Sequence, residues 1–469
     1  MSITSMSFLC FLMMGILFYY VLPFSLWKKA VLLFLSIVFY VSFNALDLWF
    51  LGGMILFSYC TAFFVDEYKY KRIAIISVVP VIAGLAIYKY GNLYLSTLDT
   101  HMRLVAPLGI SFFSFKIIGY LVDVYRGKCE VERSLLNYAT YVSFFPQISS
   151  GPIQKPDSFL KQIAQVKHMN FELVRHGFLL VFFGYFEKVV IAERLYLLVE
   201  RCFSDMSVLT PSLALIGSVA YAFQLYADFD AYSNIAIGIG ELFGISCERN
   251  FHVPYLARNI KEFWERWHIS LSTWLKDYVY IPLGGSRKGL IRKYFNLIAV
   301  FLVSGLWHGT GWNFLLWGVV NGLFRVLYDV FDRFVFSRVH LRFKPLKWIV
   351  SLAGTSINFV MIVFLWILFR CSSVEEIRLI CGLLVQLDFS AISFVIPDLA
   401  MSELMVTVLL TGLLILCDIL RNMGFTMTHF GKLFFPLRWV VLAAVLIMGI
   451  LFAVYGQGYD PSKFIYIEF

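Results

Sequence analysis

Apolar segments long enough to cross a membrane follow one another along the whole chain, with short polar connections between them. A spanning helix needs about 20 apolar residues. The segments that meet this condition are residues 7–24, 30–45, 47–65, 73–88, 104–124, 172–198, 211–226, 295–325, 348–369, 402–420 and 436–455. Three further segments, 135–153, 229–245 and 374–397, fit either short spans or re-entrant pieces, whose backbone must be covered by protein or a water-filled cavity. The pattern predicts an all-α integral membrane protein with about 10–12 spans.

Composition excludes a soluble protein. The chain is 60% hydrophobic and only 15% charged, whereas soluble domains are about 45–50% apolar and about 25% charged. We find no linker, so a single membrane domain is expected over 1–469, with its first span at Ser7–Phe24 retained rather than cleaved. The 8 cysteines form no Cys-x-x-Cys pair, and we expect them to serve in packing rather than in disulfides or a metal site.

Basic residues in the connections predict the orientation of the first spans. Lys28 and Lys29, the cluster at 69–72 and the cluster at 126–133 are each separated by two candidate spans. All three can therefore face the cytoplasm, as the positive-inside rule requires. This arrangement places the N-terminus and residues 91–103 on the outer side.

The stretch 251–293 is polar enough to leave the bilayer core, yet it is rich in aromatic residues. Its apolar residues recur at helical spacing, at Phe263, Trp267, Leu271, Trp274, Leu275 and Tyr278. This period predicts one amphipathic helix in the membrane interface. Across 258–293, basic residues outnumber acidic ones: Arg258, Lys261, Arg266, Lys276, Arg287, Lys288, Arg292 and Lys293 against Glu262, Glu265 and Asp277. The excess fits attraction to anionic lipid or, alternatively, docking of a phosphorylated cytoplasmic donor.

His308 is the strongest candidate for chemistry. It ends an apolar run and is surrounded by Gly305, Gly309 and Gly311. An ionisable residue at membrane depth is costly and is a functional candidate. Imidazole titrates near neutrality, which suits removal of a proton from a hydroxyl. The alternative is a histidine that serves only in helix packing.

Two other positions carry ionisable groups near apolar segments. His268 lies at the edge of the apolar face of the predicted amphipathic helix, where it could assist in chemistry or simply hold its ring tip in water. Asp228 and Asp230 do not share a helix face. For these carboxylates we expect a structural role, through capping or pairing with a basic residue of 249–266. The remaining histidines, at 101, 168, 176, 252, 340 and 429, have no motif around them.

Several motifs in a fixed order resemble those of the membrane-bound O-acyltransferases (MBOAT), in the bacterial branch that O-acetylates alginate and peptidoglycan. They are Pro107–Phe115, Tyr120–Gly127, Phe144–Ile153, the Asp228 segment, Phe263–Trp274, Tyr280–Gly285, Ser304–Gly309 and the tail Phe464–Phe469. One departure is in the Asp228 segment, where Ala231 and Asn234 stand at positions at which the family often has Gly and Asp. The resemblance implies an MBOAT-like multi-helix bundle with interfacial amphipathic and re-entrant helices, and a motif core at about 104–325.

The resemblance also implies an activity. His308 matches the catalytic histidine of the family, and His268 matches its assisting polar position. The co-substrate would be acetyl-CoA, with no metal. For its binding we expect Arg287 and Lys288, from the basic segment 258–293, together with Trp264 and Trp267. The acceptor would be a hydroxyl of an extracytoplasmic cell-envelope polysaccharide.

The implied setting is the bacterial inner membrane, as a multi-pass protein. Expected partners are membrane lipid, acyl-CoA and an extracytoplasmic acetyltransferase or acyl-accepting protein, with no nucleic acid. The alternative within the family is D-alanyl transfer to teichoic acid. A transporter or scaffold is the alternative from another class, but transporters usually show repeated halves, and this chain has no such symmetry.

Overall fold

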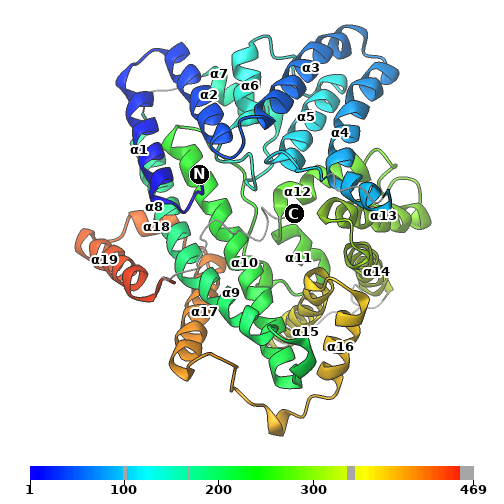
Figure 1. Cartoon of the computed structure of the whole chain (residues 1–469), viewed down its shortest axis with the longest axis vertical. Coiled ribbons are helices and arrows are strands. Elements are labelled where there is room, and N and C mark those ends of the chain that lie inside the picture. Colours follow the sequence, from blue (N-terminus) through cyan, green and yellow to red (C-terminus); the bar gives the residue numbers. More distant parts are fainter. Residues whose placement is uncertain (99–102, 166–168, 335–343, 455–469) are drawn as a thin grey trace. The chain divides into compact units, whose positions relative to one another are not determined.

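The computed structural model describes residues 1–98, 103–165, 169–334 and 344–454, and within these ranges it contains helices and no strand (Figure 1). Two compact units are present. Unit 1 comprises 1–185 and 232–249, and unit 2 comprises the described parts of 186–231 and 250–459. The all-α fold is confirmed. The single domain expected over 1–469 stays a prediction.

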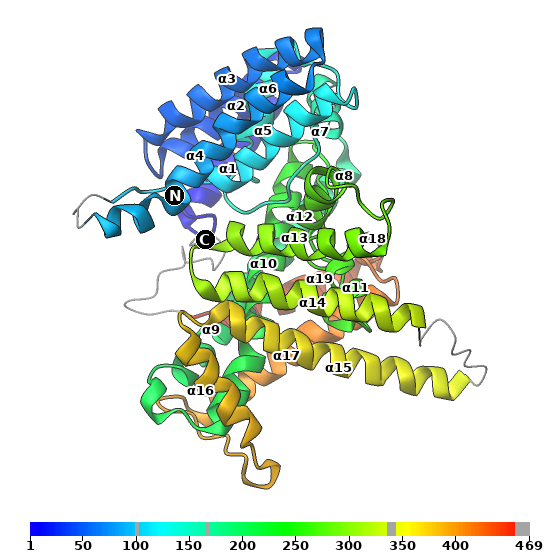
Figure 2. The same cartoon turned by 90° about the vertical axis from the view of Figure 1, so that its right-hand side faces the viewer.

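Unit 1 is a bundle of helices that begins at the N-terminus. Its helices are α1 (Met6–Val21), α2 (Ser25–Val41), α3 (Asp47–Tyr68), α4 (Lys71–Thr97), α5 (Ile110–Tyr125), α6 (Leu135–Ser143), α7 (Pro156–Ala164), α8 (Phe171–Phe186) and the last part of α10 (Pro211–Leu242). Figure 2 shows α2, α3, α4 and α5 side by side. A left-handed residue, Lys69, ends α3 and allows α4 to begin two residues later. Helix α5 is buried along nearly its whole length, so neighbouring helices cover it on all sides.

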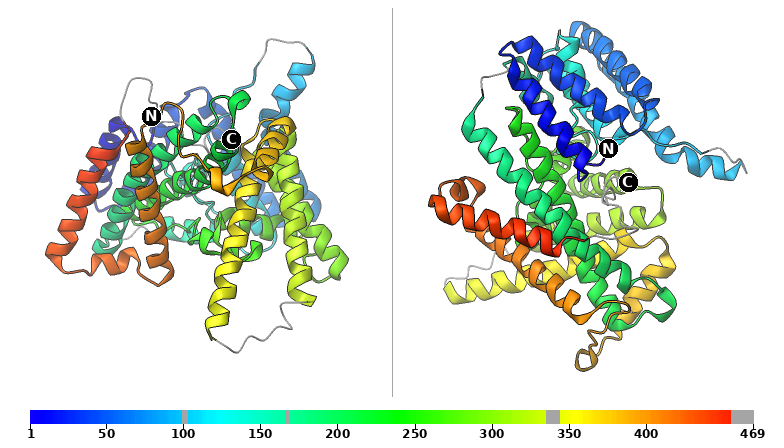
Figure 3. Two further views of the ribbon diagram at one scale, coloured as in Figure 1. Left: turned by 90° about the horizontal axis from the view of Figure 1, so that it is seen from below. Right: turned by 60° about the vertical axis from the view of Figure 1, so that its left-hand side comes forward.

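Unit 2 holds the remaining elements. They are the π-helix η1 (Glu187–Ala192), α9 (Glu193–Cys202), η2 (Met206–Val208), the first part of α10, η3 (Pro254–Leu256), α11 (Ile260–Arg266), α12 (Ile269–Leu275), η4 (Lys276–Tyr280), α13 (Leu290–His308), α14 (Trp312–Phe334), α15 (Lys344–Arg370), α16 (Val374–Val385), η6 (Phe389–Ala391), α17 (Met401–Asn422), α18 (Met427–Gly431) and α19 (Phe435–Phe452). Helices α13, α14 and α15 lie side by side (Figures 2 and 3).

Glycines allow α13 and α14 to approach closely. A Cβ atom on Gly305 would lie 2.4 Å from the carbonyl oxygen of Phe314, and one on Gly318 would lie 2.6 Å from that of Phe301. Such contacts leave no room for a methyl group. Close helix contact is therefore the reason for Gly305, which precedes His308 by less than one turn.

In the described part of the chain, seven helices are long and apolar enough to cross a membrane. They are α3, α4, α13, α14, α15, α17 and α19, with α1 as a shorter apolar helix. The division of the sequence into segments was wrong in two places. Residues 295–325 form two helices, because the chain leaves the helix at Gly309 and re-enters it at Trp312. Residues 211–226 and 229–245, conversely, belong to one helix, α10.

The segment 135–153 consists of the short helix α6 and a buried stretch without regular structure. Residues 144–153 of this stretch are buried in unit 1. Irregular backbone at membrane depth requires such covering by protein. This arrangement fits the re-entrant interpretation of the segment.

The two carboxylates of α10 pair with basic residues, but not with those that the sequence indicated. Lys188 Nζ lies 2.5 Å from Asp228 Oδ1 and 2.6 Å from Glu193 Oε1, and all three side chains are buried. Arg421 Nη1 donates to Asp230 Oδ2 at 3.0 Å. The predicted partners in 249–266 were wrong, because the actual ones come from η1 and α17, which are distant in the sequence.

Replacing Lys188 with Met should strongly destabilise the protein, because it leaves Asp228 and Glu193 buried without their cation. Removing one partner of a buried ion pair typically costs about 3–5 kcal/mol. Thermal unfolding in detergent measures the loss. Lys161→Met is the control, since Lys161 pairs with Asp157 on the surface and its loss should leave the unfolding temperature unchanged. Equal unfolding temperatures for the two variants would contradict the prediction.

Candidate functional site

His308 is the last residue of α13 and its side chain is buried, with 4% exposed. Three aromatic rings surround the imidazole. Their centroids lie 4.7 Å (Trp307), 5.2 Å (Trp317) and 5.0 Å (Phe369) from that of His308, and the last two rings stand nearly perpendicular to it. Gly309, in extended conformation, ends the helix directly after this residue. The end of helix α13 therefore places the imidazole among aromatic side chains inside unit 2.

His268 lies at a break in the predicted amphipathic helix. Helix α11 ends at Arg266 and α12 begins at Ile269, while His268 has a φ of +42°, which is uncommon for a residue other than glycine. The prediction of a single helix from Phe263 to Tyr278 was therefore wrong at this point. The prediction that the ring tip of His268 lies in water was also wrong, because the residue is only 1% exposed. The apolar pattern still identified the buried side, which includes Phe263 and Trp267.

Backbone hydrogen bonds from a distant segment replace those lost at the break. Ile269 N donates to Asn250 O at 2.8 Å, and His252 N donates to Arg266 O at 2.9 Å. Buried backbone polar groups need such partners. Residues 250–252 thereby hold the turn that carries His268.

The side chain of Asn250 determines the tautomer of His268. Its Oδ1 atom lies 3.3 Å from His268 Nδ1 and accepts a hydrogen bond from Ser270 Oγ at 2.6 Å. An amide oxygen can only accept, so Nδ1 carries the proton and the lone pair is on Nε2. Burial lowers the pKa of His268, which lies outside the spanning helices, to about 3. The imidazole is therefore neutral at pH 7.

The two histidines belong to one aromatic cluster. Trp307 lies between them, with its ring centroid 6.4 Å from His268 and 4.7 Å from His308. Trp264 contacts Trp317 at 5.8 Å, and Trp267 contacts Trp366 at 4.8 Å. The structure thus brings together His268, His308, Trp264 and Trp267, which were predicted as site residues from separate parts of the sequence.

Arg287 and Lys288 lie in a different environment. Both are exposed in the turn between η4 and α13. Asn296 of α13 is fully buried and holds this turn, because its side-chain amide donates to Gly285 O at 2.9 Å. The turn is well positioned for contact with solutes or lipid, while the histidines are enclosed.

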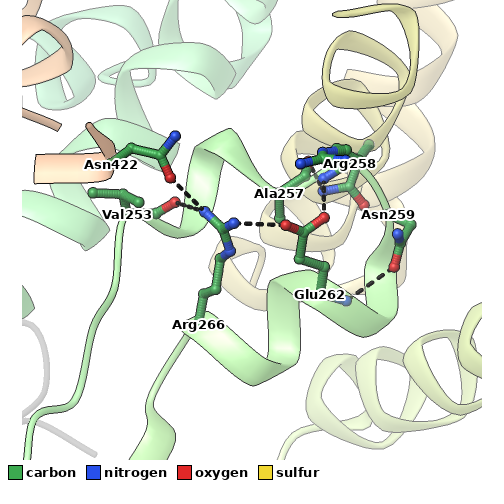
Figure 4. Close-up of polar contacts among 8 residues, drawn as sticks. Val253, Ala257, Arg258, Asn259, Glu262, Arg266 and Asn422 are labelled. Carbon is green, nitrogen blue, oxygen red and sulfur yellow. Dashed lines mark hydrogen bonds and ion pairs between the residues drawn. The ribbon is translucent and has the colours of Figure 1, made fainter. Parts of the chain in front are cut away.

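A polar network holds α11 in place (Figure 4), the helix that ends two residues before His268. Arg266 Nη2 donates to Glu262 Oε1 at 2.6 Å, and Glu262 Oε2 accepts from the backbone of Arg258 at 2.8 Å. Asn259 caps the helix, since its Oδ1 accepts from Glu262 N at 2.9 Å. Arg266 also reaches Val253 O at 3.4 Å. Glu262 and Arg266 on the polar face of the predicted helix therefore join α11 to the preceding residues 253–258.

Sequence reasoning missed several residues of this site. Asn250, Trp317 and Phe369 lie outside the motifs named above, and Ser270 lies within Phe263–Trp274 but was not selected as a site residue. Asn250 also carries no periodic signal. In unit 1, His176 Nδ1 lies 2.6 Å from Glu241 Oε2, a pairing that the sequence also did not indicate. His101, His168, His340 and the tail motif at 464–469 lie outside the described residues. Among those described, no group of His, Cys, Asp and Glu could hold a metal ion.

Comparison with known proteins identifies the family. Residues 32–374, which include both histidines, match the MBOAT, membrane-bound O-acyltransferase family. A probable alginate O-acetylase, AlgI, of Pseudomonas aeruginosa is 33% identical over 74% of this chain and 68% of its own length. A peptidoglycan O-acetyltransferase of Helicobacter pylori is 32% identical over 80% of this chain and 77% of its own length.

A teichoic acid D-alanyltransferase of Bacillus subtilis is also similar, at 29% identity over 57% of this chain and 68% of its own length. The family match covers most of the chain, and the apolar helices are those of a multi-pass membrane protein. The relatives named are bacterial. The chain therefore belongs to the membrane-bound O-acyltransferase family and is an O-acyltransferase of the bacterial inner membrane.

Proposed function

We propose that this enzyme transfers the acetyl group of acetyl-CoA toward hydroxyl groups of an extracytoplasmic cell-envelope polysaccharide of the alginate or peptidoglycan type. The observation that carries the proposal is the buried imidazole of His308 at the end of α13, joined to His268 through Trp307. The activities named for the two relatives above support the acetyl group and the class of acceptor.

In the proposed reaction His308 is the general base. As the acceptor hydroxyl oxygen attacks the carbonyl carbon of the thioester, its proton passes to His308. The tetrahedral intermediate then collapses, the carbon–sulfur bond breaks, and the leaving thiolate takes the proton back from His308. The aromatic cluster excludes water, which would otherwise compete with the hydroxyl and hydrolyse the thioester.

His268 is the assisting group in this proposal. Its neutral imidazole presents a lone pair on Nε2 and cannot act as a cation, because burial keeps its pKa near 3. The hydrogen bond from Nδ1 to Asn250 fixes the tautomer, so Nε2 remains the acceptor. Such a group can accept a hydrogen bond from a hydroxyl and orient it for attack by its oxygen.

The proposed donor enters from the cytoplasmic side and the acceptor lies outside, so the acetyl group crosses the bundle without the CoA. An extracytoplasmic acetyltransferase or acyl-accepting protein would receive it. Transfer of D-alanine to teichoic acid is the second candidate, supported by the similar protein of B. subtilis. The segment Tyr280–Gly285 favours the acetylating branch.

The first test concerns His308. His308→Ala should insert and fold normally but lose polymer O-acetylation, because removal of a general base typically lowers the rate by about 10²–10⁴. O-acetyl groups on the polymer of expressing cells provide the measurement. His429→Ala is a matched control, since His429 is exposed at the short helix α18 and outside the aromatic cluster of His308. Near-normal acetylation by His308→Ala at equal expression would rule out the role.

The second test uses the pKa of His268. The unfolded chain binds a proton on this imidazole below about pH 6.5, whereas the folded chain does not until about pH 3. The contribution of His268 to stability is therefore complete above pH 6.5 and falls by about 1.4 kcal/mol per pH unit toward pH 3.

Thermal unfolding in detergent at pH 7 and pH 5 measures this dependence. Between these values the wild-type unfolding temperature should fall more than that of His268→Gln, which lacks the titrating group. His429→Gln, which replaces an exposed histidine instead, is the control for the substitution itself. An unchanged decrease in His268→Gln would show that His268 is not buried in its neutral form.

The third test separates two roles for the exposed basic turn. If Arg287 and Lys288 attract the phosphates of CoA, changing both to Glu should raise the KM for acetyl-CoA in detergent, most strongly at low salt. The same change at Lys71 and Arg72, an exposed basic pair at the start of α4, is the control. An unchanged KM combined with poorer membrane insertion would assign the turn to anionic lipid.

A further inference from the structure

Trp317 is the largest fully buried side chain in contact with His308. It lies on α14, is 1% exposed, and its ring stands at 81° to the imidazole with 5.2 Å between centroids. Trp264, Phe369 and Trp366 enclose the other sides of the indole, at 5.8, 5.6 and 6.4 Å. The indole therefore adjoins the site where the thioester must react.

The indole N–H of Trp317 has no hydrogen-bond acceptor among the described residues, and neither does that of Trp264. Both nitrogen atoms are nevertheless buried. A third tryptophan of the cluster behaves differently, because Trp366 Nε1 donates to Tyr255 OH at 3.1 Å. Buried donors in native proteins are normally paired, so the donor of Trp317 beside His308, and that of Trp264 beside Trp317, require an explanation.

We propose that Trp317 is a catalytic residue whose indole N–H donates a hydrogen bond to the carbonyl oxygen of the acyl thioester, with Trp264 as the second donor. This inference rests on the proposed acyl transfer. Attack by the hydroxyl oxygen forms a carbon–oxygen bond and moves the carbonyl electron pair onto that oxygen. The two N–H groups stabilise this charge until the carbonyl re-forms and the thiolate leaves.

The chemistry of indole suits this task. The indole N–H can donate a hydrogen bond but cannot accept one, and it carries no charge. It therefore stabilises an oxyanion more than the neutral carbonyl of the ground state. In a site closed to water, a fixed donor stabilises developing charge more than it would in solvent. A rigid helix holds Trp317, which keeps the donor in place before the reaction begins.

Replacing Trp317 with 3-benzothienylalanine removes only the N–H, because sulfur takes the place of nitrogen in a ring of nearly the same shape. CoA release and acetyl transfer from acetyl-CoA would be measured with wild-type and variant enzyme in membrane vesicles. The kcat should fall by about 10²-fold, the loss typical for one oxyanion donor, with little change in KM. Trp317→Phe should show the same division between kcat and KM.

Trp366→3-benzothienylalanine is the matched control, since its N–H already has a partner in Tyr255, and its kcat should stay within a few-fold of wild type. A wild-type kcat for the Trp317 variant, in an assay where His308→Ala is inactive, would overturn this inference and leave the proposed function intact. Equal losses in the Trp317 and Trp366 variants would also overturn it, because the effect would then come from packing. Absence of acetyl transfer by the wild-type enzyme would overturn both.

Discussion

The site depends on two backbone hydrogen bonds that join residues 250–252 to residues 266–269. A chain that leaves the helical conformation inside a membrane protein must satisfy its N–H and C=O groups without water. Asn250 and His252 supply these partners, and only with them can the chain turn at His268. The turn then directs the His268 ring toward Trp307, while Asn250 fixes its proton. One short loop therefore determines the position, the tautomer and the burial of a histidine distant in the sequence.

The hydrophobic pattern predicted most helices well, because apolar runs and helical periodicity both reflect which side chains face the lipid or the protein core. It failed where apolar character continues across a change of backbone direction. Residues 295–325 stay apolar on both sides of Gly309, so the run conceals the junction between α13 and α14. The break at His268 is likewise invisible, since Phe263, Trp267 and Leu271 keep their helical spacing on both sides of it.

The candidate site could be predicted only in part. His308 could be identified from the sequence, because an ionisable residue at membrane depth is conspicuous on its own. Partners that come from other segments could not be identified in this way, and these include Asn250 for His268 and Lys188 for Asp228. Net charge drew attention to Arg287 and Lys288, but charge alone does not distinguish an exposed turn from an enclosed site. The aromatic cluster needed the structure, since no spacing in the sequence relates Trp264 to Trp317.

The ion pair between Asp230 and Arg421 has a consequence for biosynthesis, because the two residues are 191 positions apart. At about 5–20 residues per second, a ribosome needs about 10–40 s to make the intervening chain. During that time Asp230 on α10 has been synthesised, while Arg421, its ion-pair partner in the folded protein, has not yet been made. The nascent protein therefore passes through a stage in which this ion pair cannot form. Completion of α17 is thus the earliest point at which the contact between α10 and α17 can form, so this part of unit 2 assembles late in synthesis.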